Sequence, residues 1–223
     1  MKEIIIQGIT KIIAGIILIV VLLFLPAGTF DYWNAWLFMG LLFIPMILVG
    51  GILYFKAPEL LKKRLNSKEN EVEQKIVILW SVLLFMAGFM IAGLDYRFGW
   101  SNLPRAVIVL GGIIFLIAYG LYVEVMRENT YLSRTVEIQK GQKVIDKGLY
   151  GIVRHPMYFA TILLFLSIPI ILGSLVAFIL FLVFYPIILA KRIKNEEYVL
   201  ERGLSGYAEY KKRVRYRLFP FIW

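Results

Sequence analysis

The sequence predicts an all-α protein that crosses a membrane several times. Of its 223 residues, 60 % are hydrophobic and only 18 % are charged, whereas soluble domains are about 45–50 % apolar and about 25 % charged. The hydrophobic residues gather in long runs that are uncharged or, in the first run, carry one charge, Lys11, as spanning helices require. This composition excludes a disordered chain, a coiled coil and a soluble enzyme. The absence of cysteine and the presence of a single histidine argue against disulfides and against a metal site.

Five apolar stretches are candidates for membrane spans. A spanning helix takes about 20 residues, and four of the stretches have about this length. The fifth covers 34 residues, which at a rise of about 1.5 Å per residue is too long for one crossing. Because Gly173 and Ser174 lie at its middle, we predict a tight hairpin of two short helices that breaks near Gly173, and about six spans in total. The five stretches are Ile4–Leu25, Trp33–Phe55, Ile76–Leu94, Ala106–Val123 and Met157–Ala190.

The basic residues are divided very unevenly between the two ends of these spans. With six spans, the two termini and the loops 56–75 and 124–156 carry 23 of the 25 Lys and Arg residues. The positive-inside rule therefore places both termini and these loops in the cytosol. The net charge of +10 is then explained by topology and by contact with anionic membrane lipids. No nucleic-acid-binding motif accompanies it, so we expect membrane lipids and no nucleic acid as partners.

The residues with chemical character are concentrated in the second half of the chain. We divide the sequence into residues 1–125, which contain four spans and a basic linker at 56–75, and residues 126–223. The second part comprises a cytosolic loop, a helical hairpin over 155–195 and a cytosolic tail. The first part contains no paired charges within its spans, which argues against a transporter or a channel. The tail mixes basic and aromatic residues, a pattern typical of a short amphipathic helix and an interfacial anchor; it could also cover a site.

The loop before the hairpin has the pattern of extended structure. Val136, Ile138 and Val144 alternate with polar residues on either side of Lys140 and Gly141, which predicts a half-buried strand pair. Taken alone, the loop fits a surface connector equally well. Ordered loops of about 30 residues are, however, often functional.

The start of the hairpin is a candidate binding site. Pro156 suits the first turn of a helix, and this places His155 at the helix start, between Tyr150 and Tyr158. The amino end of a helix favours an anionic group, and aromatic faces can hold a sulfonium cation or stack on a purine. The alternative interpretation of the tyrosines is an aromatic belt at the level of the lipid headgroups.

Two charged residues follow directly on the second arm of the hairpin. Arg192 and Glu196 are four residues apart, so they share one face of a continuing helix. In isolation such a pair is a solvated ion pair that contributes about 0.3–0.5 kcal/mol. Because the two arms are antiparallel neighbours, their cytosolic ends at His155 and Arg192 come together. A histidine, an arginine, a carboxylate and two tyrosines therefore converge at one depth, which defines a candidate site.

The order and spacing of these motifs resemble the isoprenylcysteine carboxyl methyltransferase family and the related phospholipid N-methyltransferases. The resemblance covers roughly residues 130–220, whereas the first 123 residues resemble the family only as membrane spans. It implies an integral-membrane enzyme that uses S-adenosyl-L-methionine as its methyl donor. The motifs are the run Arg154-His-Pro-Met-Tyr158, the apolar hairpin, Arg192-x-x-x-Glu196-Glu197, and Gly206-Tyr-x-x-Tyr210-x-x-Arg213.

The resemblance also implies roles for particular residues. Arg192 corresponds to an arginine at the methyl acceptor, and Glu196 to a glutamate that contacts the cofactor; we take both as candidate catalytic residues. The implied acceptor is a lipophilic or prenylated molecule, and the site is expected on the cytosolic side. The residues expected to bind the cofactor are Gln142, Lys143, Val144, Ile145, Tyr150, His155, Pro156, Met157, Tyr158 and Glu196.

The chemistry of the acceptor remains open between two classes. A carboxylate is ionised at neutral pH, so its methylation requires no general base, only positioning and desolvation. Arg192 could then hold the carboxylate through two hydrogen bonds. A lipid amine would instead have to lose a proton, which Glu196 or Glu197 could accept.

Two other classes of protein are kept as alternatives. NADPH-dependent sterol reductases of membranes share a similar carboxyl-terminal motif. They usually carry an Arg-Asp pair and a cysteine after the last span, where this chain has Lys194 and Asn195 and no cysteine. A non-enzymatic membrane scaffold would leave the motifs of the hairpin unexplained.

Overall fold

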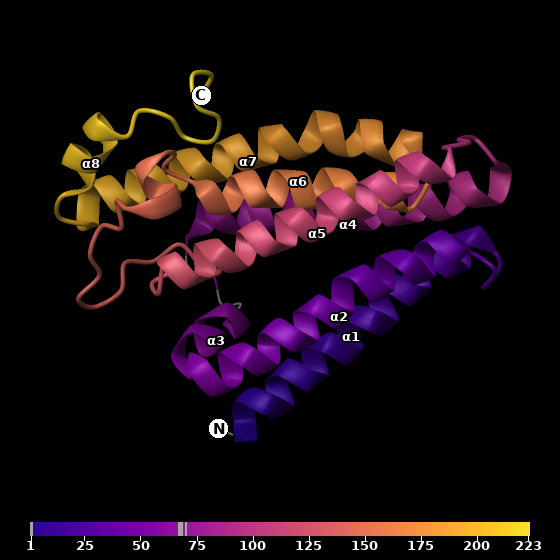
Figure 1. The fold of residues 1–223 in the computed structure, drawn as a ribbon, viewed down its shortest axis with the longest axis horizontal. Helices are drawn as coiled ribbons and strands as arrows, with labels where there is room; N and C mark the ends of the chain where they lie inside the picture. Colours follow the sequence, from indigo (N-terminus) through magenta and orange to yellow (C-terminus); the bar gives the residue numbers. More distant parts are fainter. Residues whose placement is uncertain (1, 67–68, 70) are drawn as a thin grey trace.

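The computed structural model describes residues 2–66, 69 and 71–223, and within these residues it contains helices and loops but no β-strand. Lys68, one of the basic residues of the loop 56–75, lies outside the described residues. Figure 1 shows the long helices α4 to α7 running side by side, with α1 and α2 inclined to them. In chain order they are α1 (Lys2–Ala27), α2 (Trp33–Lys56), α3 (Pro58–Leu65), α4 (Val72–Phe98), α5 (Arg105–Glu128), the 3-10 helix η1 (Gly148–Gly151), α6 (Pro156–Ile171), α7 (Leu175–Gly203) and α8 (Tyr207–Arg213).

The predicted fold class, a polytopic helical bundle, is confirmed. Five of the described helices, α1, α2, α4, α5 and α7, are long and apolar enough to cross a membrane. The remaining predicted span is α6, an apolar helix of 16 residues. At about 1.5 Å per residue it is about 24 Å long, which is shorter than the hydrocarbon core of about 30 Å.

The hairpin is confirmed, but its second arm is not short. α7 has 29 residues, because the apolar run continues without a break into a charged segment, residues 191–203, that is rich in good helix formers. Starting from the same turn, α7 therefore extends well past the first residue of α6. This overhang carries the charged residues of the candidate site.

The predicted turn lies where the sequence places it. Gly173 has a φ of +79°, a left-handed conformation that glycine adopts without strain. Ser174 then caps α7, since its hydroxyl accepts a hydrogen bond of 3.0 Å from the backbone N–H of Ala177. The side-chain amide of Asn34 in α2 donates to the carbonyl of Ile171 at 2.9 Å, which fixes the turn against the rest of the bundle.

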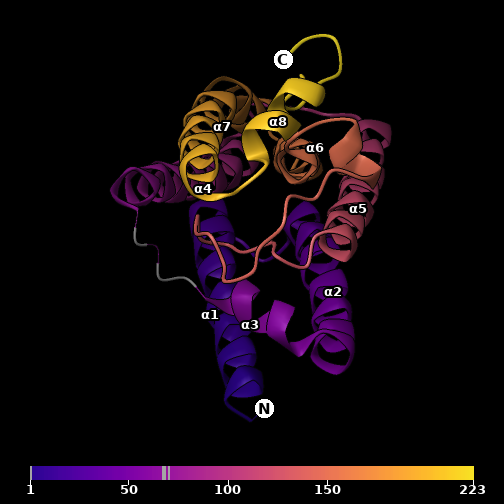
Figure 2. The same ribbon diagram turned by 90° about the vertical axis from the view of Figure 1, so that its left-hand side faces the viewer.

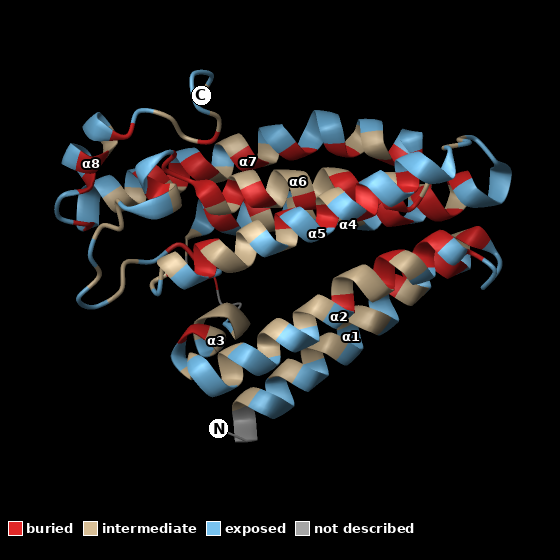
Figure 3. Cartoon of the chain, viewed as in Figure 1, coloured by how far each residue is buried: buried red, intermediate tan, exposed pale blue. Residues whose placement is uncertain are grey.

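The two ends of the bundle differ in composition. Both termini, α3, the loop after α5 and α8 lie at one end, called the loop end here, and the short connections after α1, α4 and α6 lie at the other, the turn end (Figure 1). The helices α4 to α7 lie together, whereas α1 and α2 approach them at the turn end and diverge from them toward the loop end (Figures 1 and 2). In Figure 3 the buried residues of α1 and α2 gather at the turn end.

Buried polar groups fasten the turn end. The carboxylate of Asp95 in α4 accepts hydrogen bonds from the backbone N–H of Ser101 at 2.7 Å and from the hydroxyl of Ser174. The hydroxyl of Tyr32 donates to the carbonyl of Leu172 at 2.6 Å. These bonds hold the α6–α7 turn in one place relative to α4 and the start of α2. The opposite ends of the two arms are thereby held at a fixed position as well.

The strand pair predicted for the loop before the hairpin is wrong. The turn at its middle is present, with Gly141 at a φ of +74° and a hydrogen bond of 3.0 Å from the N–H of Gln142 to the carbonyl of Gln139. The segments on either side of this turn do not pair with each other. Their backbone groups are bonded to side chains: Glu69 accepts from the N–H of Val136 at 3.2 Å, for example. The loop is therefore fixed by long-range side-chain contacts that its own sequence does not show.

Candidate functional site

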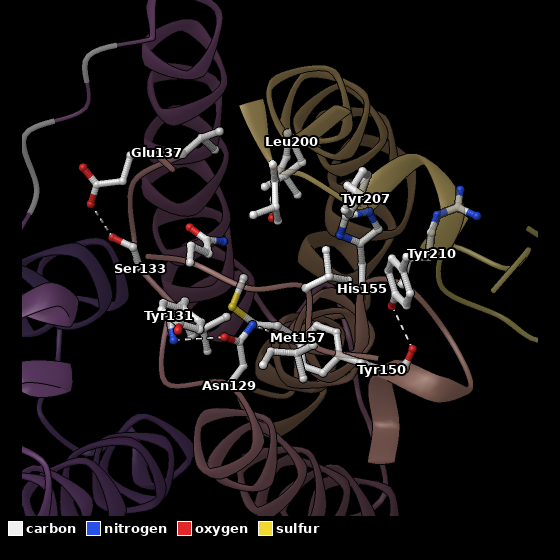
Figure 4. A pocket seen from close by; sticks show the side chains of 18 of the residues that line it. Asn129, Tyr131, Ser133, Glu137, Tyr150, His155, Met157, Leu200, Tyr207 and Tyr210 are labelled. Carbon is white, nitrogen blue, oxygen red and sulfur yellow. Dashed lines mark hydrogen bonds between the residues drawn. The ribbon is translucent and has the colours of Figure 1, made fainter. Parts of the chain in front are cut away.

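A polar cavity lies at the loop end, where the loop after α5, the first turn of α6, the overhang of α7 and α8 come together (Figure 4). It brings together every predicted cofactor residue but one. Pro156 is the exception: it is buried at the first position of α6 and does not line the cavity. The predicted residues that line the cavity are Gln142, Lys143, Val144, Ile145, Tyr150, His155, Met157, Tyr158, Arg192 and Glu196.

Tyr158 joins the two arms of the hairpin within this cavity. Its hydroxyl accepts a hydrogen bond of 2.9 Å from Nε of Arg192 and donates one to the carboxylate of Glu196. The Arg192 guanidinium also lies over the Tyr158 ring, 5.8 Å from its centre. The predicted common face of Arg192 and Glu196 is therefore present, and the expected approach of the hairpin's two ends is observed as direct contact.

The guanidinium of Arg192 is held in place on two further sides. Its Nη2 donates to the carbonyl of Arg134 at 2.9 Å, and its Nη1 donates to the side-chain oxygen of Gln74 in α4 at 3.3 Å. Gln74 in turn donates to the side-chain oxygen of Asn195 at 2.7 Å. These contacts use three of the five N–H groups of the guanidinium. The other two make no hydrogen bond with the described residues and can bind an anion.

Glu197 is the centre of a buried ion-pair network that the spacing of the motifs does not predict. Its side chain is 3 % exposed. One carboxylate oxygen accepts from Nε of Arg154 at 2.7 Å and lies 3.2 Å from Nε2 of His155, and the other accepts from Nε of Arg217 at 3.1 Å. The imidazole at the start of α6 is therefore oriented by a carboxylate from α7. Lys211 approaches the same carboxylate at 3.8 Å.

The carboxyl-terminal tail is attached to the same network. The guanidinium of Arg154 donates to the carbonyls of Val214 at 2.8 Å and Arg215 at 2.7 Å. The backbone N–H of Arg154 donates to the carbonyl of Tyr216 at 2.9 Å. The segment after α8 thus lies against the start of α6, as part of the wall that surrounds the site.

Tyrosines from η1 and α8 form another part of this wall. The hydroxyl of Tyr150 accepts a hydrogen bond of 2.9 Å from the side-chain amide of Asn129, and its carbonyl accepts one of 2.8 Å from the hydroxyl of Tyr210 (Figure 4). Burial raises the pKa of the Tyr150 and Tyr210 phenols well above their ordinary value. Both therefore remain neutral hydroxyl groups at physiological pH.

Tyr207 is a buried residue whose hydroxyl has no hydrogen-bond partner among the described residues. It is 4 % exposed and lines the polar cavity, and its Oη makes no hydrogen bond with the described residues. Burial, and then the nearby carboxylates of Glu197 and Glu196, raise the pKa of this phenol, so the hydroxyl is a neutral donor. Leaving such a group unpaired costs about 1–3 kcal/mol. A ligand with polar atoms in this cavity would supply the missing partner.

A second cavity, mostly apolar, adjoins the polar one. It has a volume of about 410 Å³ and lies between α1, α4, α6 and α7. Its walls are mainly aliphatic and aromatic, with three arginines, Arg64, Arg134 and Arg192, on the lining. Met157 and Tyr158, together with Arg192, line both cavities. The polar and the apolar space therefore meet at the start of α6 and the overhang of α7.

Comparison with known proteins shows which family this part of the chain is similar to. Residues 108–202 match the sequence model of the isoprenylcysteine carboxyl methyltransferase (ICMT) family. These matched residues are called the ICMT region here. It runs from α5 through the loop and the hairpin almost to the end of α7, and it contains the run from Arg154 to Tyr158 together with Arg192, Glu196 and Glu197.

Two relatives show how far the similarity extends. Protein-S-isoprenylcysteine O-methyltransferase B of Arabidopsis thaliana is 28 % identical over 141 residues, which cover 62 % of this chain and 70 % of the plant protein. A Delta(14)-sterol reductase of Mus musculus is 29 % identical over 91 residues, which cover 40 % of this chain and 22 % of the reductase. The chain thus matches about a fifth of the length of the reductase.

Some residues of the site lie outside the ICMT region. Gln74, which holds Arg192, and Arg64, which lines the apolar cavity, belong to the first half of the chain, and Tyr207 belongs to α8. The sequence pattern does not connect the first two with the site, because they are more than 80 residues away from the hairpin in sequence. For Glu197 a signal existed: it follows the buried Ile193 by one helical turn, which places it on the inner face of α7.

Proposed function

We propose that this protein is an integral-membrane methyltransferase that moves a methyl group from S-adenosyl-L-methionine to a lipophilic acceptor at the cytosolic face. The observation that carries this proposal is the junction of a polar with an apolar cavity at Met157, Tyr158 and Arg192. A polar cofactor and a lipophilic acceptor can approach each other there from two different environments. The similarity to the Arabidopsis methyltransferase supports the same reaction.

The chemistry of the polar cavity fits the cofactor. The cofactor, when bound, supplies an electrophilic methyl group on a sulfonium. Tyr150 and Tyr158 offer aromatic faces that favour a cation, and the carboxylate of Glu196 lies beside Tyr158. The unpaired hydroxyl of Tyr207 would donate to a polar atom of the ligand. The loop residues 142–145 would enclose the adenosine end, largely through their backbone.

Arg192 is the residue proposed to hold the acceptor. It lines both cavities and keeps two N–H groups free for an anion. A carboxylate bound to it is already ionised at neutral pH, so the chain need not supply a base. Its contribution is then to orient the carboxylate and to exclude water from the junction of the cavities. We therefore favour a carboxylate, in a molecule of the isoprenylcysteine type, as the acceptor.

Titration of the detergent-purified protein with S-adenosyl-L-methionine tests the cofactor. We expect saturable binding, and we expect Tyr207→Phe to weaken it about five- to tenfold, since one hydrogen bond contributes about 1 kcal/mol. Tyr198→Phe is the matched control, because Tyr198 is exposed and lines neither cavity. Absence of saturable binding would refute the proposal. Once binding is shown, the protein and S-adenosyl-L-methionine are added to membranes. Mass spectrometry of the lipids and acids that gain the mass of one methylene group would identify the acceptor.

An amine acceptor is distinguished from a carboxylate by the pH dependence of the rate. An amine is protonated at neutral pH and must lose a proton, which Glu196 could accept. The rate would then rise as the pH increases toward the pKa of the amine, about 10. For a carboxylate, with a reference pKa of about 4, the rate is expected to stay flat between pH 6 and 8 as long as the protein remains folded.

A sterol-type reductase is the second candidate function, because of the similarity to the mouse Delta(14)-sterol reductase. A reductase of this class would bind NADPH in the polar cavity. The same titration, carried out with NADPH, separates the two candidates. We expect no saturable NADPH binding at concentrations at which S-adenosyl-L-methionine saturates the protein, and the opposite result would favour the reductase.

A further inference from the structure

Arg64 occupies an unusual position for a charged residue. It lies near the end of α3, and its guanidinium lines the apolar cavity. There it lies over the ring of Tyr122, 5.3 Å from its centre, and its Nη1 donates to the carbonyl of Ser133 at 3.3 Å. No carboxylate of the described residues forms an ion pair with it. Most of its N–H donors are therefore left unused.

Arg64 is half-buried, and a cation that is partly removed from water without a counter-ion is costly. Taking a charge out of water requires an opposite charge or several hydrogen bonds in compensation. Burial, and then the nearby guanidinium of Arg134, lower the pKa of Arg64 to about 10. Arg64 still carries its full charge at neutral pH. The structure therefore holds an uncompensated positive charge beside an apolar space.

The other charged residues of the apolar cavity do not neutralise the charge of Arg64. Among the described residues, the lining contains three arginines and no aspartate or glutamate. Arg192 has Glu196 close by through Tyr158, whereas the Arg134 guanidinium makes no hydrogen bond or ion pair with any described residue. A cavity of about 410 Å³ is within the range of small-molecule sites. An apolar body with a cationic end matches a molecule with an apolar chain and an anionic headgroup.

We propose that Arg64 binds the anionic headgroup, a carboxylate or a phosphate, of a single-chain amphiphile whose chain fills the apolar cavity. The acceptor would then be held by arginines from two helices, Arg192 of α7 and Arg64 of α3. This anion site extends the proposed function. The identification of its occupant as the methyl acceptor rests on that proposed function. It makes Arg64, a residue outside the ICMT region, a determinant of acceptor specificity.

Photo-crosslinking of the protein in the absence of cofactor tests this. The protein is placed in nanodiscs of zwitterionic lipid with hexadecanoate that carries a diazirine on its chain, and the labelled peptides are mapped by mass spectrometry. We expect labels on cavity residues such as Phe85 and Phe165. Arg64→Gln is expected to reduce this labelling about tenfold, because a charge-assisted hydrogen bond is lost. Lys62→Gln removes the same charge from an exposed position of α3. Its labelling is expected to stay within about twofold of that of the unmodified protein.

The native protein provides a test that needs no variant. The diazirine probe with an amine in place of the carboxylate should label the cavity about tenfold less than the acid, and the alcohol should lie between them. Equal labelling by acid and amine would overturn the proposal, as would Arg64→Gln with acid labelling unchanged. Labelling of Arg64→Gln by the alcohol shows that the cavity of the variant is intact. If the variant does not fold, the ratio of acid to amine in the native protein decides.

Two further measurements are needed. The first distinguishes an amphiphile in the cavity from bulk anionic lipid, and the second distinguishes failure of this proposal from failure of the proposed function. Addition of phosphatidylglycerol to the nanodiscs should change labelling by the acid probe by less than about twofold. If phosphatidylglycerol abolishes this labelling, Arg64 binds bulk anionic lipid and the proposal is overturned. Because no cofactor is present, the result does not depend on methyl transfer. A protein that selects the acid probe but fails to bind S-adenosyl-L-methionine would refute the proposed function while keeping the anion site.

Discussion

At the scale of single residues, the site depends on Glu197, which pairs with Arg154, His155 and Arg217. We predict that Glu197→Gln lowers the free energy of unfolding by about 3–5 kcal/mol, because the guanidinium of Arg154 is left buried without its counter-ion. Thermal unfolding in detergent measures the change. Glu201→Gln, one helical turn later, removes an exposed partner of Lys211 and should cost less than about 1 kcal/mol. Equal losses in the two variants would contradict the role of Glu197.

Arg192 allows a prediction about activity. In Arg192→Lys the charge is kept, but the contacts to Gln74, Tyr158 and the carbonyl of Arg134 and the planar pair of donors are lost. We predict a fall in kcat/KM of about 10- to 100-fold, since hydrogen bonds to charged groups contribute about 1.5–3 kcal/mol.

The expected loss for Arg192→Lys concerns the acceptor rather than the cofactor. Cofactor affinity measured by titration should therefore change by less than about threefold. Arg202→Lys is the control on the same helix, because Arg202 stacks on the exposed Tyr198 and lines neither cavity. Unchanged kcat/KM in Arg192→Lys would rule out a role of its fork of donors in holding the acceptor.

The sequence predicts those residues of the site whose partners are close in the chain or related by a simple fold. The spacing of Arg192 and Glu196 places them on one face, and the hairpin brings His155 close to both. It does not predict the network of Glu197, because its partners lie 43 residues before it and 20 residues after it. Contacts of this kind depend on how the tail folds back over the start of α6.

At the scale of helices, close approaches through glycine set the positions of neighbouring elements. A Cβ at Gly93 in α4 would lie 2.5 Å from the carbonyl oxygen of Leu23 in α1, and backbone cannot move aside as a flexible side chain can. We predict that Gly93→Ala forces α1 and α4 apart and costs about 1–3 kcal/mol. Gly50→Ala is the control, since no atom lies within 4 Å of its added Cβ. Denaturant titration of both variants in detergent checks the difference.

The helices themselves are well predicted because they follow from apolar runs and a few breakers. Gly173 and Ser174 form the predicted turn, and Pro156 begins the predicted helix. The loop before the hairpin is not well predicted, because its backbone forms hydrogen bonds with distant side chains such as Glu69 and Arg192. The alternation of Val136 and Ile138 correctly indicates which side chains are less exposed, since Glu137 between them is exposed. It cannot indicate that no neighbouring strand exists.

At the scale of the whole molecule, the distribution of charge and the positions of the two cavities indicate how the protein is oriented in the membrane. The loop end carries the polar cavity, both termini and the long basic loops, and the apolar cavity extends from it into the bundle. A soluble cofactor and a membrane-dissolved acceptor would thus reach the junction from opposite sides. This requires the loop end to face the compartment that holds the cofactor.

The absence of cysteine from the chain allows this orientation to be measured directly. Lys140→Cys places a thiol at the exposed tip of the loop at the loop end, and Asn102→Cys places one at the exposed connection after α4 at the turn end. In spheroplasts of a bacterial host we expect a membrane-impermeant maleimide to label Asn102→Cys at once. We expect it to label Lys140→Cys only after permeabilisation, because the basic loops stay in the cytosol. Reversed labelling would place the polar cavity outside the cytosol and remove the supply of cofactor on which the proposed reaction depends.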